Sequence, residues 1–201
     1  MHNVKRYFRE GRVYFLTHVT YKRRPILVKN VDLLLRAFDR SNISMDTGFL
    51  VGPNPCGSDE TNSGDKVGPN PCGSDSVTTT PALLAWCILP DHLHLLLEPG
   101  VADVSMLTRR FKLSFAALYR KRIGAVKGRV WHNRYWDHVI RDEIDLNRHI
   151  DYIHYNPVKH GMASRAGAYR HSSFGQYMSA GTYSENWATR EDVFVGHDFG
   201  E

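Results

Sequence analysis

Two histidines one residue apart are the first side chains in this sequence whose types and spacing could do chemistry. His92 and His94 flank Leu93 and precede three leucines. Side chains alternate between the two faces of a β-strand, so both imidazoles would point to the same side. Two neighbouring imidazoles can bind one divalent metal ion. An isolated His-x-His is as often two polar residues on a half-exposed strand as a metal-binding pair. Here the leucines indicate a strand that is buried on both faces, and a buried histidine pair needs a partner.

A tyrosine in the longest predicted helix is the second candidate. Tyr119 lies near the end of this helix, about 80° round from Phe111 and therefore at the border of the apolar stripe. A tyrosine hydroxyl can act as a covalent nucleophile, although a border tyrosine commonly keeps its ring on the core and its hydroxyl in water. A basic run at residues 120–122 follows directly, which favours a position beside a phosphate backbone.

The positive charge of the chain is concentrated around this tyrosine. The net charge is +5, and residues 109–129 include many Lys and Arg but no Asp or Glu. A solvated helix face normally mixes both signs, so this segment predicts a surface that faces phosphates; the alternative is a merely soluble basic helix. We expect DNA contacts from nine basic residues of this and later segments: Arg109, Arg110, Lys112, Arg120, Lys121, Arg122, Arg134, Arg141 and Lys159. The aromatic residues Trp131, Tyr135 and Trp136 could stack on unpaired bases or pack as cross-strand pairs.

Hydrophobic patterns predict the elements that position these residues. Strands are expected over residues 12–21, 81–89, 92–98 and 130–141, and helices over 32–40, 103–122 and 144–155. The last helix should end before Pro157, because the residue before a proline avoids helical geometry. This order predicts an α+β fold of the ferredoxin-like split β-α-β type, an antiparallel sheet with helices packed on one face, plus a C-terminal helix.

One irregular stretch interrupts this pattern. The segment VGPNPCGSD at residues 51–59 recurs letter for letter at residues 67–75. Its Gly, Pro, Asn and Ser content predicts a flexible surface insertion over residues 51–80. We expect one domain over residues 1–178 that contains this insertion, and a C-terminal tail over 179–201. Of the three cysteines, Cys87 lies in an apolar run and is expected in the core. The sequence has no Cys-x-x-Cys pair, so we expect no zinc site.

Length and composition fit one folded domain. The chain has 201 residues, of which 42% are hydrophobic and 11% aromatic, enough for one well-packed core. No apolar run approaches the roughly 20 residues that cross a bilayer, and residues 1–10 have no apolar segment of a signal peptide. We therefore expect no membrane partner and a cytoplasmic, nucleoid-associated location.

The ordered set of motifs resembles the HUH nucleases and, within them, the REP-associated branch of the single-tyrosine transposases. The segment LPDHLH at residues 89–94 is similar to their metal-binding strand, and Tyr119 falls where single-tyrosine transposases carry their nucleophile. Residues 131–162, which include WDHVIR at 136–141 and DYIHYNPVKHG at 151–161, closely resemble the REP-associated branch. The resemblance covers roughly residues 7–170 apart from the insertion.

This resemblance implies a metal-dependent enzyme that nicks and rejoins single-stranded DNA at imperfect hairpins. A divalent ion, Mg²⁺ or Mn²⁺, would be held by His92 and His94 and act on the scissile phosphate. Tyr119 would attack that phosphate and form a 5′-phosphotyrosine intermediate. The resemblance leaves a monomer and a homodimer both open.

One departure from the family pattern favours an alternative. Related transposases place a polar metal ligand one helical turn after the tyrosine, where this chain has Ile123. The alternative is a catalytically inactive protein of the same fold that binds DNA hairpins. A small-molecule phosphohydrolase with a histidine-triad site ranks last, because the alternating series would need a further histidine where the chain has Leu96.

Overall fold

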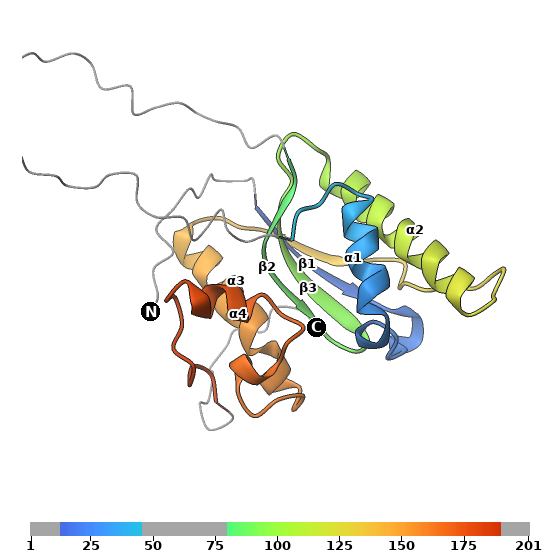
Figure 1. Cartoon of the computed structure of the whole chain (residues 1–201). Helices are drawn as coiled ribbons and strands as arrows, with labels where there is room; N and C mark the ends of the chain where they lie inside the picture. Colours follow the sequence, from blue (N-terminus) through green and yellow to red (C-terminus); the bar gives the residue numbers. More distant parts are fainter. Residues whose placement is uncertain (1–12, 46–79, 190–201) are drawn as a thin grey trace, which may run out of the picture.

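A four-stranded antiparallel sheet forms the centre of the computed structural model, which describes residues 13–45 and 80–189 (Figure 1). The strands are β1 (Tyr14–Val19), β2 (Ala82–Ile88), β3 (His92–Glu98) and β4 (Trp136–Val139), and the sheet order is β2-β3-β1-β4. The main helices are α1 (Val31–Asp39), α2 (Val104–Arg122), α3 (Glu143–Lys159) and α4 (Phe174–Ser179). The sheet order and the sequence of elements confirm the ferredoxin-like α+β prediction.

The central strand β3 is buried on both faces, as the run of leucines predicts. It pairs with β1 on one side and β2 on the other, and His94 lies opposite Thr17 of β1 and Cys87 of β2. Its bounds are the predicted ones, residues 92–98. Pro90 and Asp91 turn the chain before the strand, and Pro99 follows it. Cys87 is fully buried, as expected for a core residue.

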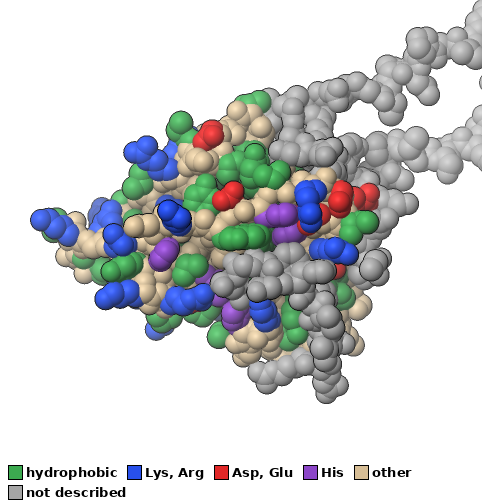
Figure 2. Space-filling model, turned by 180° about the vertical axis from the view of Figure 1, so that it is seen from behind, with side chains coloured by type: hydrophobic (Ala, Val, Ile, Leu, Met, Phe, Trp, Pro, Cys, Tyr) green, Lys and Arg blue, Asp and Glu red, His purple; other side chains and the backbone are tan. Residues whose placement is uncertain are grey.

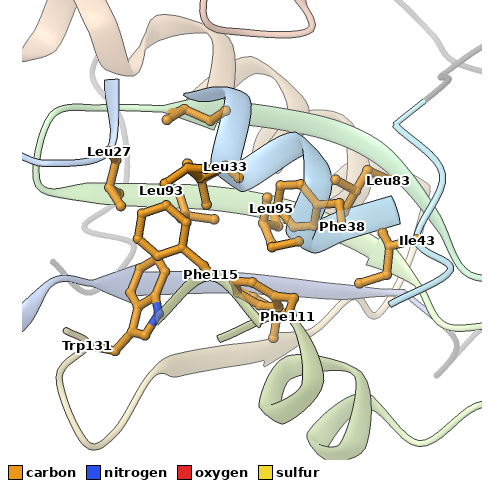
Figure 3. Packing of buried hydrophobic residues seen from close by; sticks show 14 of the residues in the cluster. Leu27, Leu33, Phe38, Ile43, Leu83, Leu93, Leu95, Phe111, Phe115 and Trp131 are labelled. Atoms are coloured by element: carbon orange, nitrogen blue, oxygen red, sulfur yellow. The ribbon is translucent and has the colours of Figure 1, made fainter. Parts of the chain in front are cut away.

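Helices cover both faces of the sheet, whereas the sequence pattern predicted helices on one face. Helices α1 and α2 pack on one face over a first core, part of which Figure 3 shows, and this core includes Leu16, Leu93, Leu95, Phe111 and Phe115. Helices α3 and α4 cover the opposite face over a second core, which includes Phe15, Leu96, Ile150, Ile153 and Phe174. Every other side chain of β1 and β3 points to this second face of the sheet, because side chains alternate along a strand. The apolar ones among them need helices α3 and α4 to shield them from water.

Two elements, β4 and α3, differ most from their predicted bounds. Strand β4 covers only four residues of the predicted strand 130–141, and Trp131 forms an isolated bridge with Thr20, the residue after β1. Helix α3 continues through Pro157, although Pro157 was expected to lie beyond its end. A proline removes one backbone hydrogen bond, but Pro157 and its neighbours Asn156 and Val158 are buried. Tertiary packing therefore outweighs the local preference in this last turn.

The polypeptide after α4 packs on the domain as far as the structure describes it. Tyr183 and Ala188 are buried in the second core, so the described part of the predicted tail contributes side chains to that core. The rest of that tail and nearly all of the predicted insertion at 51–80, with its two repeats, lie outside the described residues. Among the described helices, none is long and apolar enough to cross a membrane.

Candidate active site

The histidine pair on β3 is buried and held in a fixed orientation. His92 and His94 point to the second face of the sheet, and their ring centres lie 5.1 Å apart. Nδ1 of His92 is hydrogen-bonded to the Asp91 carboxylate at 2.7 Å, and Nδ1 of His94 to the Thr17 hydroxyl at 2.9 Å. Such contacts fix the ring orientation of metal-binding histidines. Because Nδ1 of each ring is engaged, a metal ion would bind through Nε2.

A charged chain of contacts continues from His92 to the surface. Arg23 donates to the second carboxylate oxygen of Asp91 at 3.3 Å. Burial alone would raise the pKa of Asp91, but the hydrogen bonds from His92 and Arg23 outweigh burial and lower it. Lys22 and Arg23 both have left-handed backbone conformations, with φ of 58° and 47°, which are uncommon for residues with a side chain and often occur at functional sites. Arg23, His92 and His160 line a hollow of about 250 Å³.

One face of helix α3 lies against the histidine pair. The ring centre of Tyr152 lies 5.5 Å from that of His94, edge to face, and the ring centre of His160 lies 5.0 Å from that of His92. Asn156 is four residues from each of them and therefore lies between them on the same helix face. Its side-chain oxygen is buried and has no hydrogen-bond partner among the described residues. Lys159 donates to the Tyr152 hydroxyl at 3.4 Å.

The predicted nucleophile Tyr119 lies on the other face of the sheet. It is half-buried on α2, packs against the first core and stacks on Phe115 at 6.0 Å. His94 instead stacks on Phe15, which belongs to the second core. The sheet therefore separates Tyr119 from the histidine pair, and the structure does not bring them together. Ile123 is exposed beside Tyr119 and is likewise remote from the pair.

The nine predicted DNA-binding residues divide into two groups. Five already contact other parts of the protein: Arg122 binds Asp32 and Asn30, Arg141 pairs with Asp145, Arg120 donates to Gly128, Lys112 donates to His132, and Lys159 donates to Tyr152. The other four side chains are on exposed residues: Arg109, Arg110, Lys121 and Arg134. Figure 2 shows Lys and Arg side chains gathered at the end of the molecule formed by α2 and its following loop, at the left of that view.

A second cluster of possible metal ligands lies at the start of α3. His138, Asp145 and His149 have ligand atoms within 4.8 Å of one another. The Asp145 carboxylate already accepts hydrogen bonds from His138 and from the backbone and side chain of Arg141. Burial would raise the pKa of Asp145, but these bonds outweigh burial and hold it at about 2. The cluster therefore connects β4 to the start of α3, the helix that carries Tyr152, without needing an ion.

The residues at the β3–α3 contact fit a divalent ion better. Two imidazoles with anchored Nδ1 atoms and a buried, unpartnered amide oxygen form a nitrogen and oxygen donor set on one side of the sheet. Sequence reasoning named the two histidines but missed Asn156, Tyr152, Asp91 and Thr17 as members of this site. The spacing of four between Tyr152, Asn156 and His160 was the available signal, because it places all three on one helix face.

The fold agrees with that of a known class of DNA-processing proteins. The family described as "Transposase IS200 like" matches residues 78–156, which contain β2 to β4 and most of α3. A solved REP-associated tyrosine transposase bound to a REP hairpin shares the fold, with a TM-score of 0.62 and 24% identity over 100% of both chains. The family match, over part of the chain, indicates the class of the IS200-like transposases, and the solved structure shows the shared fold.

Two curated relatives define the family more closely. A protein of Haemophilus influenzae named "Putative REP-associated tyrosine transposase" is 34% identical over 125 residues, which are 57% of this chain and 71% of the relative. Another from Escherichia coli is 34% identical over 106 residues, which are 52% of this chain and 61% of that relative. The chain belongs to the family of REP-associated tyrosine transposases.

Proposed function

We propose that this protein nicks and rejoins single-stranded DNA at hairpin repeat sequences, in a metal-dependent reaction that passes through a 5′-phosphotyrosine on Tyr152. The observation that carries the assignment of Tyr152 is its 5.5 Å ring separation from His94, on the same side of the sheet as His92. A nucleophile and the group that activates the phosphate must reach one phosphorus atom. Tyr119, on the opposite face, lacks that proximity.

The residues on this face can be given separate roles. A divalent ion such as Mg²⁺ or Mn²⁺, held by His92, His94 and Asn156, would supply a Lewis acid for the scissile phosphate. Lys159, whose amine donates to the Tyr152 hydroxyl, would stabilise negative charge on the tyrosine oxygen. Assigning Tyr152 also removes the difficulty at Ile123, because Asn156 supplies a polar side chain one helical turn after the tyrosine.

The proposed reaction exchanges one phosphate ester for another. The Tyr152 hydroxyl gives up its proton as its oxygen attacks phosphorus, and the bond from phosphorus to the 3′ oxygen breaks. The 3′ oxygen takes up one proton to become a hydroxyl, so no proton is gained or lost overall. The 5′ end of the DNA stays joined to the tyrosine as a phosphodiester. Rejoining reverses these steps, so the exchange needs no nucleotide cofactor.

The experiment is a cleavage assay on hairpin oligonucleotides from the DNA that flanks the gene, with Mg²⁺ or Mn²⁺ and a denaturing gel. The wild type should form a protein–DNA adduct that requires metal. Tyr152→Phe and His94→Ala should form none. Tyr119→Phe is the matched control, and it should retain the adduct because its hydroxyl lies on the other face.

The same gel distinguishes the competing assignments. An adduct that survives Tyr152→Phe and disappears with Tyr119→Phe would restore Tyr119 as the nucleophile. Tight binding by the wild type without any adduct, with several hairpins and both metals, would instead indicate a hairpin-binding protein that does not cut.

A further inference from the structure

We propose that a groove between α2 and residues 131–135 binds one unpaired nucleotide of the DNA, at a site separate from the catalytic residues. This inference rests on the proposed function, because it assigns a second contact to the same DNA. The groove has a volume of about 340 Å³, and its walls include Arg109, Lys112 and Leu113 of α2 on one side and Asn133 and Tyr135 on the other.

The cations of the groove suit the phosphate of the nucleotide. The Lys112 amine lies 6.0 Å from the ring centre of Trp131 and 5.8 Å from that of Tyr135, and it donates to the His132 carbonyl at 3.2 Å. Burial lowers the pKa of Lys112, and a bound phosphate would offset that loss of hydration. Arg109 is exposed on the same wall, so the two cations can share one phosphate.

The remaining walls suit a base. The Tyr135 ring packs against His18 at 5.0 Å, and Tyr135 itself lines the groove, where its ring offers a stacking surface. Trp131 is buried, and its indole nitrogen donates to the Lys112 carbonyl, so this ring supports the groove from below. Leu113 is 57% exposed. The apolar side chain of Leu113 and the ring of Tyr135 suit the two faces of a base. The Asn133 amide can donate a hydrogen bond to the edge of the base or accept one from it.

A neighbouring hollow indicates which way the DNA strand leaves the groove. It shares Ser105 and Tyr135 with the groove but is lined by the carboxylates of Asp103 and Asp137. These carboxylates repel phosphates, so the strand should leave toward the other end of α2. That end carries the basic residues visible at the left of Figure 2.

The location of the groove sets what its loss should affect. His18 and Phe111, which pack beside Trp131, lie on the α2 side of the sheet, whereas His92 and His94 face α3. A nucleotide in the groove is therefore not the one that reacts. Removing the contacts that the groove makes should weaken DNA binding and leave the rate of adduct formation from bound DNA unchanged.

The test measures binding by fluorescence anisotropy in EDTA, so that no cleavage occurs. Two fluorescein-labelled probes are compared: a gene-flanking hairpin with an unpaired extension, and the same hairpin without it. Arg109→Ala and Tyr135→Ala should weaken binding of the extended hairpin by about tenfold and barely affect the other probe. Arg109→Ala should also reduce the slope of log K against log salt by about 0.7, the value of one single-strand phosphate contact.

Two matched variants separate the groove from general effects. Arg110→Ala removes the same charge one residue away, outside the groove, and should weaken both probes equally and only slightly. Tyr135→Phe keeps the ring and should restore binding. Equal losses for Arg109→Ala and Arg110→Ala, or no difference between the probes, would overturn the groove. The proposed function would still stand if the wild type binds the hairpin and forms the metal-dependent adduct in the cleavage assay. A wild type that binds neither probe would overturn both.

Discussion

Tyr152 of α3 meets His94 of β3 edge to face, with 5.5 Å between their ring centres. On the other side of His94, its Nδ1 atom is hydrogen-bonded to Thr17 of β1. Three elements that are distant in the sequence therefore converge on one imidazole. Each of them can be altered separately, and the expected effects follow from the contacts.

Replacing Thr17 with valine should weaken metal binding while leaving both histidines in place. Valine has the shape of threonine but cannot hydrogen-bond to Nδ1 of His94, so the imidazole loses its orientation. Loss of such a contact typically weakens metal affinity about 10- to 100-fold. The measurement is calorimetric titration with Mn²⁺. Thr108→Val, a buried threonine on α2, is the control and should bind Mn²⁺ like the wild type; an unchanged affinity in Thr17→Val would refute the role of this contact.

Replacing Asn156 with leucine should stabilise the fold and abolish tight metal binding together. The buried side-chain oxygen of Asn156 lacks a partner among the described residues, and such a group costs about 1–3 kcal/mol. Leucine removes that cost, so we expect the free energy of unfolding to rise by about 1 kcal/mol in metal-free buffer. Urea unfolding and Mn²⁺ titration measure the two effects. Asn156→Asp should keep metal binding, and a destabilised Asn156→Leu that still binds Mn²⁺ would contradict a ligand role.

Replacing Arg122 with alanine should affect the fold more than DNA binding. Its guanidinium donates to Asp32 and Asn30, which connects the end of α2 to the start of α1. Lys121→Ala is the matched comparison, because Lys121 is exposed and adjacent. We expect a lower Tm for Arg122→Ala alone, and about threefold weaker DNA binding for Lys121→Ala. If Arg122→Ala has the wild-type Tm and the larger loss of DNA binding, Arg122 contacts DNA instead.

Acid should destabilise the protein through His154. Burial lowers the pKa of His154 to about 3, below the ordinary value of about 6.5 that it regains on unfolding. Between these values the unfolded state binds one more proton than the folded state, so stability falls as pH falls from about 6.5 toward 3. The slope from this residue is about 1.4 kcal/mol per pH unit.

The measurement for His154 is urea unfolding at several pH values between 7 and 4. His154→Gln keeps a polar group near Ser173, which the His154 ring contacts at 2.8 Å, but it cannot titrate. The pH slope of this variant should be smaller than that of the wild type by about one proton. An unchanged slope would mean that His154 is already protonated in the folded protein.

The sequence by itself determined the local features of this protein. The alternation of β3 placed His92 and His94 on one face, and the leucines around them required burial on both sides. The order of elements predicted the sheet, which the structure confirms. These features follow from neighbours along the chain, through a period of two in a strand and about 3.6 in a helix.

Only the tertiary structure decided which helix faces the histidines. Tyr119 and Tyr152 both lie on predicted helices, and helical periodicity says which side of a helix is apolar but not which face of the sheet that helix covers. That choice depends on how each connection crosses the sheet edge and on which apolar face still needs cover. Because α2 packs with α1 and α3 covers the opposite face, Tyr152 reaches His94 and Tyr119 does not.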